Sequence, residues 1–160
     1  MDLKDYIRSI KDYPKKGILF RDITTLIKNE TAFEETINQI VERSKKFKVD
    51  KIAAIESRGF VFASAVSYIL KKPFIMLRKK NKLPADVHSV DFELEYGTAT
   101  IEVHKDSISE NDSVLIIDDL IATGGTAEAA AKLIEISKGN IAAFIFVINL
   151  FDLGGCDNLL

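Results

Sequence analysis

Two adjacent acids, Asp118 and Asp119, stand shortly before a turn of small residues, and this pairing could do chemistry. The turn comes where a helix is expected to begin, and its residues are Ala122, Thr123, Gly124, Gly125 and Thr126. The first N–H groups of a helix have no intrahelical partners, and the helix dipole favours an anion there. Small residues let an anion approach this backbone, and the two threonines add hydroxyl donors. We therefore predict a phosphate-binding turn.

The aspartate pair predicts what the phosphate is attached to. Adjacent carboxylates repel each other unless hydroxyls or cations accept them. The 2′- and 3′-hydroxyls of a ribose that carries a 5′-phosphate would meet this need beside the turn. The alternative is structural: an acid and a glycine turn that only end a strand. The sequence of the turn matches neither the Walker loop nor the G-x-G-x-x-G dinucleotide fingerprint.

A second anion site is predicted from two other segments. Ser57, Arg58 and Gly59 follow an apolar run and open a predicted helix, so they offer N–H groups, a hydroxyl and a guanidinium. An N-cap serine beside a surface arginine is the alternative. Residues 71–82, which include Arg78 and Lys82, hold six Lys or Arg and no acid, whereas residues 83–119 hold ten acids and one base. A basic loop next to an acidic stretch indicates a site for an anion.

The apolar pattern predicts the elements that position these groups. Short apolar runs predict strands over 52–55, 74–77, 114–117 and 142–150. Helical spacing predicts helices over 31–47, 60–70 and 127–136. A polar stretch over 81–97 precedes an alternating segment that ends at Val103 and predicts half of a hairpin. This alternation predicts an α/β fold with a mainly parallel sheet, whose ligands bind at the carboxyl ends of the strands.

Composition limits the classes of protein that remain. A chain of 160 residues, 47% hydrophobic, has the size and core of one domain. Its 22 Lys and Arg against 24 Asp and Glu give a net charge of −2, which argues against a nucleic-acid binder. The single cysteine, Cys156, argues against a disulfide framework. The sequence contains neither the roughly 18 consecutive apolar residues of a membrane span nor the pattern of a signal peptide, so we expect a cytoplasmic protein without membrane contact.

Residues 114–126 resemble the phosphoribosyl-pyrophosphate (PRPP) signature of the type I phosphoribosyltransferases. Four further segments, 12–24, 56–60, 94–97 and 148–155, narrow the resemblance to the adenine-specific members, over essentially the whole chain. The resemblance implies a single domain over 1–160, with a twisted sheet flanked by helices. It also implies a small N-terminal hood over 1–30 and a mobile catalytic loop over 81–97.

The resemblance further implies a reaction: adenine and PRPP give AMP and pyrophosphate, in purine salvage. Mg²⁺ would be held mainly through PRPP, and the enzyme would be a homodimer. Asp118, Asp119 and Arg58 would be the catalytic residues. The 5′-phosphate would bind at 122–126, as the residues themselves suggest. The pyrophosphate would bind Ser57, Arg58, Gly59, Arg78 and Lys82.

The base site is expected, by the same resemblance, at Leu19, Phe20 and Arg21, with the adenine ring stacked on Phe20. The catalytic loop would contribute Phe92, Glu95 and Tyr96. Phe92 stands where many relatives carry a tyrosine, so it has no hydroxyl to contribute. We assign no general acid, and the two histidines, His88 and His104, match no motif and are expected at the surface.

Two other functions remain open at this stage. A phosphoribosyltransferase for a 6-oxopurine or orotate would keep the phosphate signature, but residues 19–21 argue against it. A non-catalytic PRPP sensor that regulates transcription would need a DNA-binding domain or a basic face. The last residues, 156–160, stop short of the final strand of typical relatives, so either the chain is truncated or a neighbour completes the sheet edge.

Overall fold

The computed structural model describes residues 2–94, 97–121 and 125–149. It divides the chain into two compact units, Met1–Glu42 and Arg43–Leu160. The first unit is longer than the N-terminal hood expected over 1–30, and the hood itself stays a prediction. In the described part of the chain no helix is long and apolar enough to cross a membrane.

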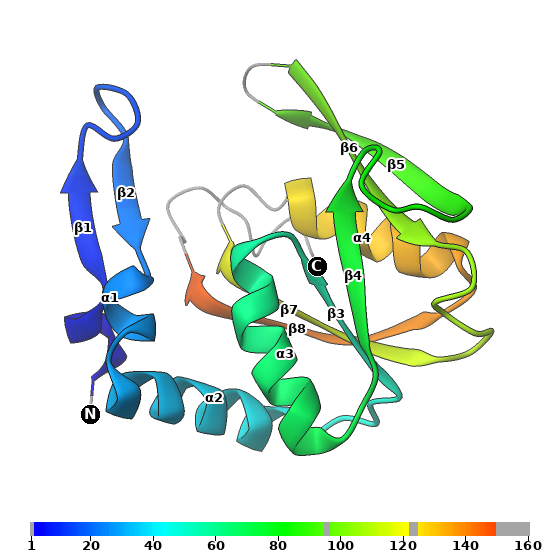
Figure 1. Cartoon of the computed structure of the whole chain (residues 1–160), viewed down its shortest axis with the longest axis horizontal. Helices are drawn as coiled ribbons and strands as arrows, with labels where there is room; N and C mark the ends of the chain where they lie inside the picture. Colours follow the sequence, from blue (N-terminus) through cyan, green and yellow to red (C-terminus); the bar gives the residue numbers. More distant parts are fainter. Residues whose placement is uncertain (1, 95–96, 122–124, 150–160) are drawn as a thin grey trace. The chain divides into compact units, whose positions relative to one another are not determined.

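The N-terminal unit is a two-stranded antiparallel sheet with short helices. Strands β1 (Arg8–Lys11) and β2 (Leu19–Asp22) pair with each other after the short 3-10 helix η1 (Leu3–Tyr6). Helix α1 (Thr24–Ile27) follows, and α2 (Glu30–Ser44) continues into the second unit (Figure 1). The predicted helix over 31–47 is confirmed except at its end, where turns close on Arg43 and Ser44 and leave Phe47 beyond the helix.

One buried carboxylate, Asp22, joins these short elements. It accepts hydrogen bonds from the Thr24 hydroxyl at 2.6 Å, the Thr24 N–H at 2.9 Å and Nε of Arg8 at 2.9 Å. These hydrogen bonds, those of Thr24 first, lower the pKa of Asp22 to about 2. The end of β2 is thereby tied to β1 and to the start of α1, which fixes the strand that carries Leu19, Phe20 and Arg21.

The second unit is built on a six-stranded mixed sheet in the order β5-β6-β4-β3-β7-β8. Strands β3, β4, β7 and β8 are parallel neighbours, and β5 and β6 form an antiparallel hairpin on the β4 edge. Their bounds are Lys51–Ile55 (β3), Phe74–Lys79 (β4), Val87–Leu94 (β5), Gly97–His104 (β6), Ser113–Ile121 (β7) and Asn140–Asn149 (β8). The predicted α/β fold with a mainly parallel sheet is confirmed.

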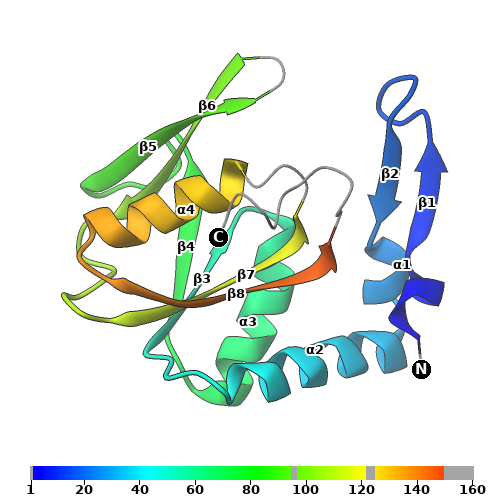
Figure 2. The same ribbon diagram turned by 180° about the vertical axis from the view of Figure 1, so that it is seen from behind.

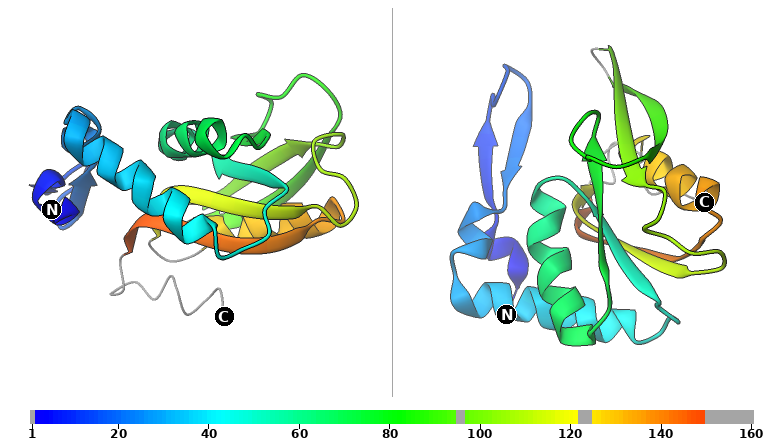
Figure 3. Two further views of the ribbon diagram at one scale, coloured as in Figure 1. Left: turned by 90° about the horizontal axis from the view of Figure 1, so that it is seen from below. Right: turned by 45° about the vertical axis from the view of Figure 1, so that its right-hand side comes forward.

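Two helices cover opposite faces of this sheet, as the views from below and behind show (Figures 2 and 3). Helix α3 (Arg58–Leu70) packs on β3 and β7 and buries Phe62 and Val66 completely. Helix α4 (Gly125–Ile136) buries Ala130 and Leu133 in the core cluster of the other face. The strands between them are apolar on both sides, which explains their unbroken apolar runs.

Two expected boundaries are wrong in informative ways. Strand β7 does not end at Ile117 but runs to Ile121, because β8 pairs with it as far as Ile121 opposite Asn149. The aspartate pair therefore lies inside a strand. In addition, part of the stretch expected as a loop over 81–97 is strand β5 (Val87–Leu94), paired along its whole length with β6. Whether this hairpin moves during the reaction stays a prediction.

Candidate functional site

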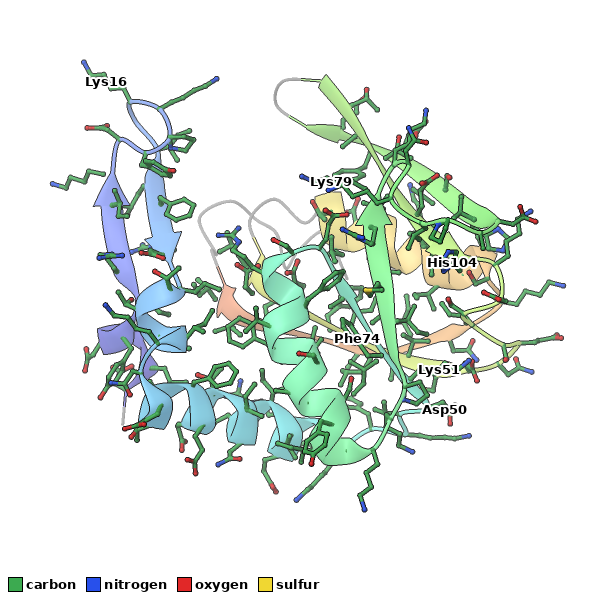
Figure 4. All side chains as sticks on the ribbon, viewed as in Figure 1. Lys16, Asp50, Lys51, Phe74, Lys79 and His104 are labelled. Atoms are coloured by element: carbon green, nitrogen blue, oxygen red, sulfur yellow. The ribbon has the colours of Figure 1, made fainter. Side chains whose placement is uncertain are left out.

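The candidate site lies at the carboxyl edge of the parallel strands, where the segments after β3, β4 and β7 meet. In Figure 4, Lys79 marks this end of β4, whereas Asp50 and Lys51 mark the opposite end of the sheet. The N–H of Glu56 donates to the Leu77 carbonyl at 3.0 Å and so holds the first two of these segments together. This is the edge at which open α/β sheets bind their ligands.

The aspartate pair and Arg58 form the centre of the site. Nε of Arg58 lies 3.0 Å from Oδ2 of the buried Asp119, and the Arg58 side chain remains 43% exposed. Oδ1 of Asp118 accepts the Asp119 N–H at 2.8 Å. Burial, followed by the adjacent Asp119 side chain, raises the pKa of Asp118 to about 8. At neutral pH Asp118 can thus donate a hydrogen bond while Asp119 faces a guanidinium.

The start of α3 is pressed against the carboxyl-terminal half of β7 through Gly59. A Cβ on Gly59 would lie 2.8 Å from Oδ1 of Asp118 and 3.2 Å from the Ile117 carbonyl oxygen, so the contact requires glycine. Ser57 occupies the N-cap position of α3, but its side chain forms no capping hydrogen bond. The purely structural reading of Ser57 as a helix cap is therefore not supported. The predicted loop 57–59 and the predicted aspartates meet directly.

Glu56 brings the two predicted pyrophosphate cations to the same place, and this role was not foreseen from the sequence. Its carboxylate, 8% exposed, accepts the Lys79 N–H at 2.6 Å and the Lys82 ammonium at 3.2 Å, and lies 3.4 Å from Nε of Arg78. Burial alone would raise the pKa of Glu56, but these hydrogen bonds and charges hold it below its ordinary value. The sequence offered one indication of this role: Glu56 directly follows the predicted strand over 52–55 and stands two residues before Arg58.

The phosphate-binding turn is described only in part. Gly125 and Thr126 form the start of α4, as predicted, and both are partly buried. Ala122, Thr123 and Gly124 lie outside the described residues, as do Glu95 and Tyr96 of the expected catalytic loop and the C-terminal residues 150–160. Two residues of β7, Leu120 and Ile121, separate the aspartates from this turn.

The remaining candidates lie on other elements. Leu19, Phe20 and Arg21 belong to β2 of the N-terminal unit, where Phe20 makes an edge-to-face contact with Tyr13 at 5.2 Å. Phe92 packs with the core cluster on the α4 side, so it anchors β5. The two histidines are partly buried rather than fully exposed, and Nε2 of His104 accepts the Ala85 N–H at 3.2 Å. The contacts of residues 19–21 with a base stay a prediction.

The protein is an α/β protein with a mainly parallel sheet, and the carboxyl edge of that sheet presents an aspartate pair and two basic segments. This arrangement suits a phosphorylated sugar that carries a second anionic group. Comparison with known families gives this class a name. Residues 22–149 match the phosphoribosyl transferase domain, and the chain belongs to this family.

Individual relatives narrow the comparison further. Adenine phosphoribosyltransferase of Pelagibacter ubique is 84% identical over 159 residues, which cover 99% of this chain and 91% of that protein. The crystal structure of adenine phosphoribosyltransferase from Thermoanaerobacter pseudethanolicus is similar with a TM-score of 0.95 at 45% identity, over 98% of this chain and 91% of that one. The Saccharomyces cerevisiae enzyme, complexed with an imino-altritol bisphosphate and adenine, has a TM-score of 0.93 at 34% identity, over 99% and 92% of the two chains.

Proposed function

We infer that this chain is an adenine phosphoribosyltransferase, which converts adenine and PRPP into AMP and pyrophosphate. The observation that carries this conclusion is the 84% identity, over nearly the whole chain, with a relative of that name. The geometry agrees with it, because Arg58 links the loop expected to hold pyrophosphate to the acids expected to hold the ribose. This function places the chain in purine salvage.

The reaction forms one bond and breaks one at the anomeric carbon. N9 of adenine attacks C1′ of the ribose as the bond from C1′ to the pyrophosphate oxygen breaks, with inversion, and the N9 proton is lost. The sugar passes through a state of oxocarbenium character, as in other glycosyl transfers. A protonated Asp118 can donate to a ribose hydroxyl, and the Asp119 carboxylate can accept from one and face the developing positive charge.

The pyrophosphate leaves as an anion, and the cations at the carboxyl edge receive its charge. We assign this task to Ser57, Arg58, Gly59, Arg78 and Lys82. Glu56 supports the assignment, because it gathers Arg78 and Lys82 beside the loop that opens α3. The start of α4, with Gly125 and Thr126, would hold the 5′-phosphate through N–H groups and a hydroxyl. The enzyme's contribution is then chiefly alignment and charge stabilisation.

We propose that Mg²⁺ enters the site with PRPP and is held mainly by oxygens of that substrate. Within the described ranges no three His, Cys, Asp or Glu side chains group as metal ligands. Asp118 and Asp119 suit a cation that is held indirectly, since Oδ2 of Asp119 is buried and already faces Nε of Arg58 at 3.0 Å. These two residues would hold the ion through ribose hydroxyls or water. When bound, the ion neutralises part of the pyrophosphate charge.

The base would bind at Leu19, Phe20 and Arg21, where the ring of Phe20 offers a face for stacking. The expected loop residues Phe92, Glu95 and Tyr96 would close over the reactants and exclude water, which would otherwise hydrolyse the activated sugar. The packing of the Phe92 ring against the core supports only an anchoring role for this residue: it fixes strand β5, which leads to Glu95 and Tyr96. A cytoplasmic location is also proposed, because a chain with one cysteine suits a reducing compartment.

A homodimer is proposed as the assembly, with a second copy of this chain as the partner. The outer surface of α3 exposes three large apolar side chains: Val61 at 37%, Tyr68 at 86% and Ile69 at 47%. Met76 of β4 adds a fourth at 45%. Apolar side chains gathered in this way are typical of interaction surfaces.

The decisive experiment measures the release of pyrophosphate, and the nucleotide formed, from PRPP and Mg²⁺ with adenine, hypoxanthine, guanine and orotate in turn. We expect AMP from adenine and no turnover of the other bases. Faster turnover of another base would assign the chain to a different phosphoribosyltransferase. Binding of PRPP without turnover would support the sensor.

The phosphate turn is tested by Thr126→Ala, which removes one hydroxyl donor. Because a hydrogen bond to a charged group contributes about 1.5–3 kcal/mol, kcat/KM should fall by at least about tenfold. Thr31→Ala is the matched control, since Thr31 is likewise the second residue of its helix but is exposed. Circular dichroism should show both variants folded; an unfolded Thr126→Ala would indicate a purely structural turn.

A further inference from the structure

One buried carboxylate of the second unit has no part in the reaction described above. Glu102 lies in the middle of β6 and is only 7% exposed. Burying a carboxylate is costly unless it is paired or hydrogen-bonded. The hydrogen bonds that compensate for the burial of Glu102 therefore indicate its role.

Both oxygens of Glu102 are committed to the backbone and side chains of neighbouring segments. Oε1 accepts the N–H of Asn81 at 2.9 Å, and Oε2 accepts the hydroxyl of Ser89 at 2.7 Å. In the sheet register Glu102 stands opposite Arg78 of β4 on one side and Ser89 of β5 on the other. One carboxylate thus connects the loop after β4 with the β5 arm.

The two expected pyrophosphate cations stand on either side of the turn at Asn81: Arg78 near the end of β4, and Lys82 in the loop that follows. Asn81 has a positive φ of 68°, so the chain turns sharply there, between Arg78 and Lys82. Beyond the turn, Lys82 returns to Glu56 and donates to Oε2 at 3.2 Å. The loop is therefore held at two points by two carboxylates: Glu56 from the β3 side and Glu102 from the β6 side.

We propose that Glu102 is a positioning residue for pyrophosphate binding: by accepting the Asn81 N–H it fixes the turn that brings Lys82 back beside Glu56 and Arg78. The proposal rests on the function proposed above. Glu102 acts through the loop and touches no substrate. Its loss should therefore weaken ligands that contain pyrophosphate and spare those that do not.

The test compares binding of PRPP, pyrophosphate and AMP by calorimetry, with Mg²⁺ present. Loss of a hydrogen bond to a charged group predicts that Glu102→Ala raises the Kd of PRPP and of pyrophosphate by about tenfold, with the Kd of AMP changed by less than about twofold. Glu102→Gln should restore binding to within about threefold, because its amide oxygen can accept from Asn81 and its NH₂ group can donate to Ser89. Hydrogen exchange of residues 79–83 should be faster in Glu102→Ala only.

Two control variants test whether the effect comes from the Asn81 contact of Glu102 rather than from its Ser89 contact or its charge. Ser89→Ala removes the arm contact and leaves the Asn81 contact, so PRPP binding should be nearly unchanged. Glu110→Ala removes the same charge from an exposed position and should have no effect. If Glu102→Ala does not fold, Glu102→Asp replaces it: this side chain is one methylene shorter and cannot reach both partners, so PRPP binding should weaken while Glu102→Gln retains it.

Three results would overturn the proposal. They are unchanged PRPP binding in the Ala or Asp variant, an equal loss of AMP binding, and Glu102→Gln as impaired as Glu102→Ala. Failure of the wild-type chain to form AMP is a separate result: it would remove the proposed function, while the pyrophosphate measurements would still decide whether Glu102 positions the loop.

Discussion

At the residue scale, the site shows how two identical neighbours acquire different properties. Asp118 is desolvated and lies beside a like charge, whereas the carboxylate of Asp119 has the guanidinium of Arg58 at 3.0 Å. Burial and the neighbouring acid penalise the ionised form of Asp118, and they outweigh the Asp119 N–H and the Arg58 charge, which favour it. The pair therefore combines a donor and an acceptor at neutral pH, which two exposed carboxylates could not do. That combination suits the two adjacent hydroxyls of a ribose.

The raised pKa of Asp118 predicts a pH dependence of stability. The value rises from 3.8 to about 8, so between these pH values the folded chain retains a proton that the unfolded chain releases. Stability should fall as the pH rises through this window, by up to about 1.4 kcal/mol per pH unit. Asp118→Asn cannot ionise, so its thermal midpoint should exceed that of the wild type by more at pH 8 than at pH 5.

Thermal unfolding at pH 5 and pH 8, measured without substrate, tests whether Asp118 is protonated in the folded chain. Asp106→Asn, at an exposed position, is the control and should shift the midpoint equally at both. A constant difference between Asp118→Asn and the wild type would show that Asp118 is ionised throughout, and the division of roles between the two acids would have to be abandoned.

At the element scale, the strand cores could be predicted from sequence and their ends could not. Runs such as 52–55 and 114–117 are apolar because helices cover both faces of those strands. The end of β7 depends on how far β8 pairs with it, and no local pattern records that register. Strand β5 was missed because polar residues separate its apolar ones, Val87, Val90, Phe92 and Leu94, so it lacks the unbroken apolar run of the central strands.

Some residues of the candidate site could likewise be predicted from the sequence, and others could not. The aspartates and the loop 57–59 could be found because each is a local string with its own chemistry. The roles of Glu56 and Glu102 could not be found, because each depends on a partner more than twenty residues away: Lys79 for Glu56 and Asn81 for Glu102. Single acids in a sequence carry no sign of such pairing, and only the register of the strands brings it about.

Contact between the start of α3 and the end of β7 leads to a prediction for Gly59. In Gly59→Ala the new methyl group would lie 2.8 Å from Oδ1 of Asp118, so the helix or the carboxylate must shift. Overpacking of this kind costs about 1–3 kcal/mol, which exceeds the gain of about 1 kcal/mol in helix propensity. We expect a lower free energy of unfolding in urea and a loss of kcat/KM of at least tenfold.

The control for this variant lies on the same helix. Ser64→Ala adds no atom and changes an exposed position of α3, so activity and stability should both be retained. A fully active Gly59→Ala would mean that the aspartate pair tolerates displacement, and alignment of the ribose by Asp118 would lose its support.

At the scale of the whole molecule, the two compact units carry different parts of the expected chemistry. The residues expected to bind the base lie in Met1–Glu42, and those expected to bind PRPP lie in Arg43–Leu160. Specificity for the base and affinity for the activated sugar can therefore change through substitutions in different units. Charge is concentrated locally within the second unit, because residues 71–82 hold six Lys or Arg and no acid.

The apolar surface of α3 predicts how copies of this molecule associate. Tyr68 and Ile69 are 86% and 47% exposed, and burying each in a dimer would contribute roughly 1.5–3 kcal/mol. Tyr68→Asp combined with Ile69→Asp should therefore raise the dimer dissociation constant by at least about 100-fold, measured by sedimentation velocity. Ile136→Asp is the matched control, because Ile136 is 48% exposed but lies at the end of α4, and this variant should remain dimeric. If the double variant stayed dimeric while Ile136→Asp dissociated, the interface would lie on the α4 side of the sheet, and the α3 surface would have to be explained in another way.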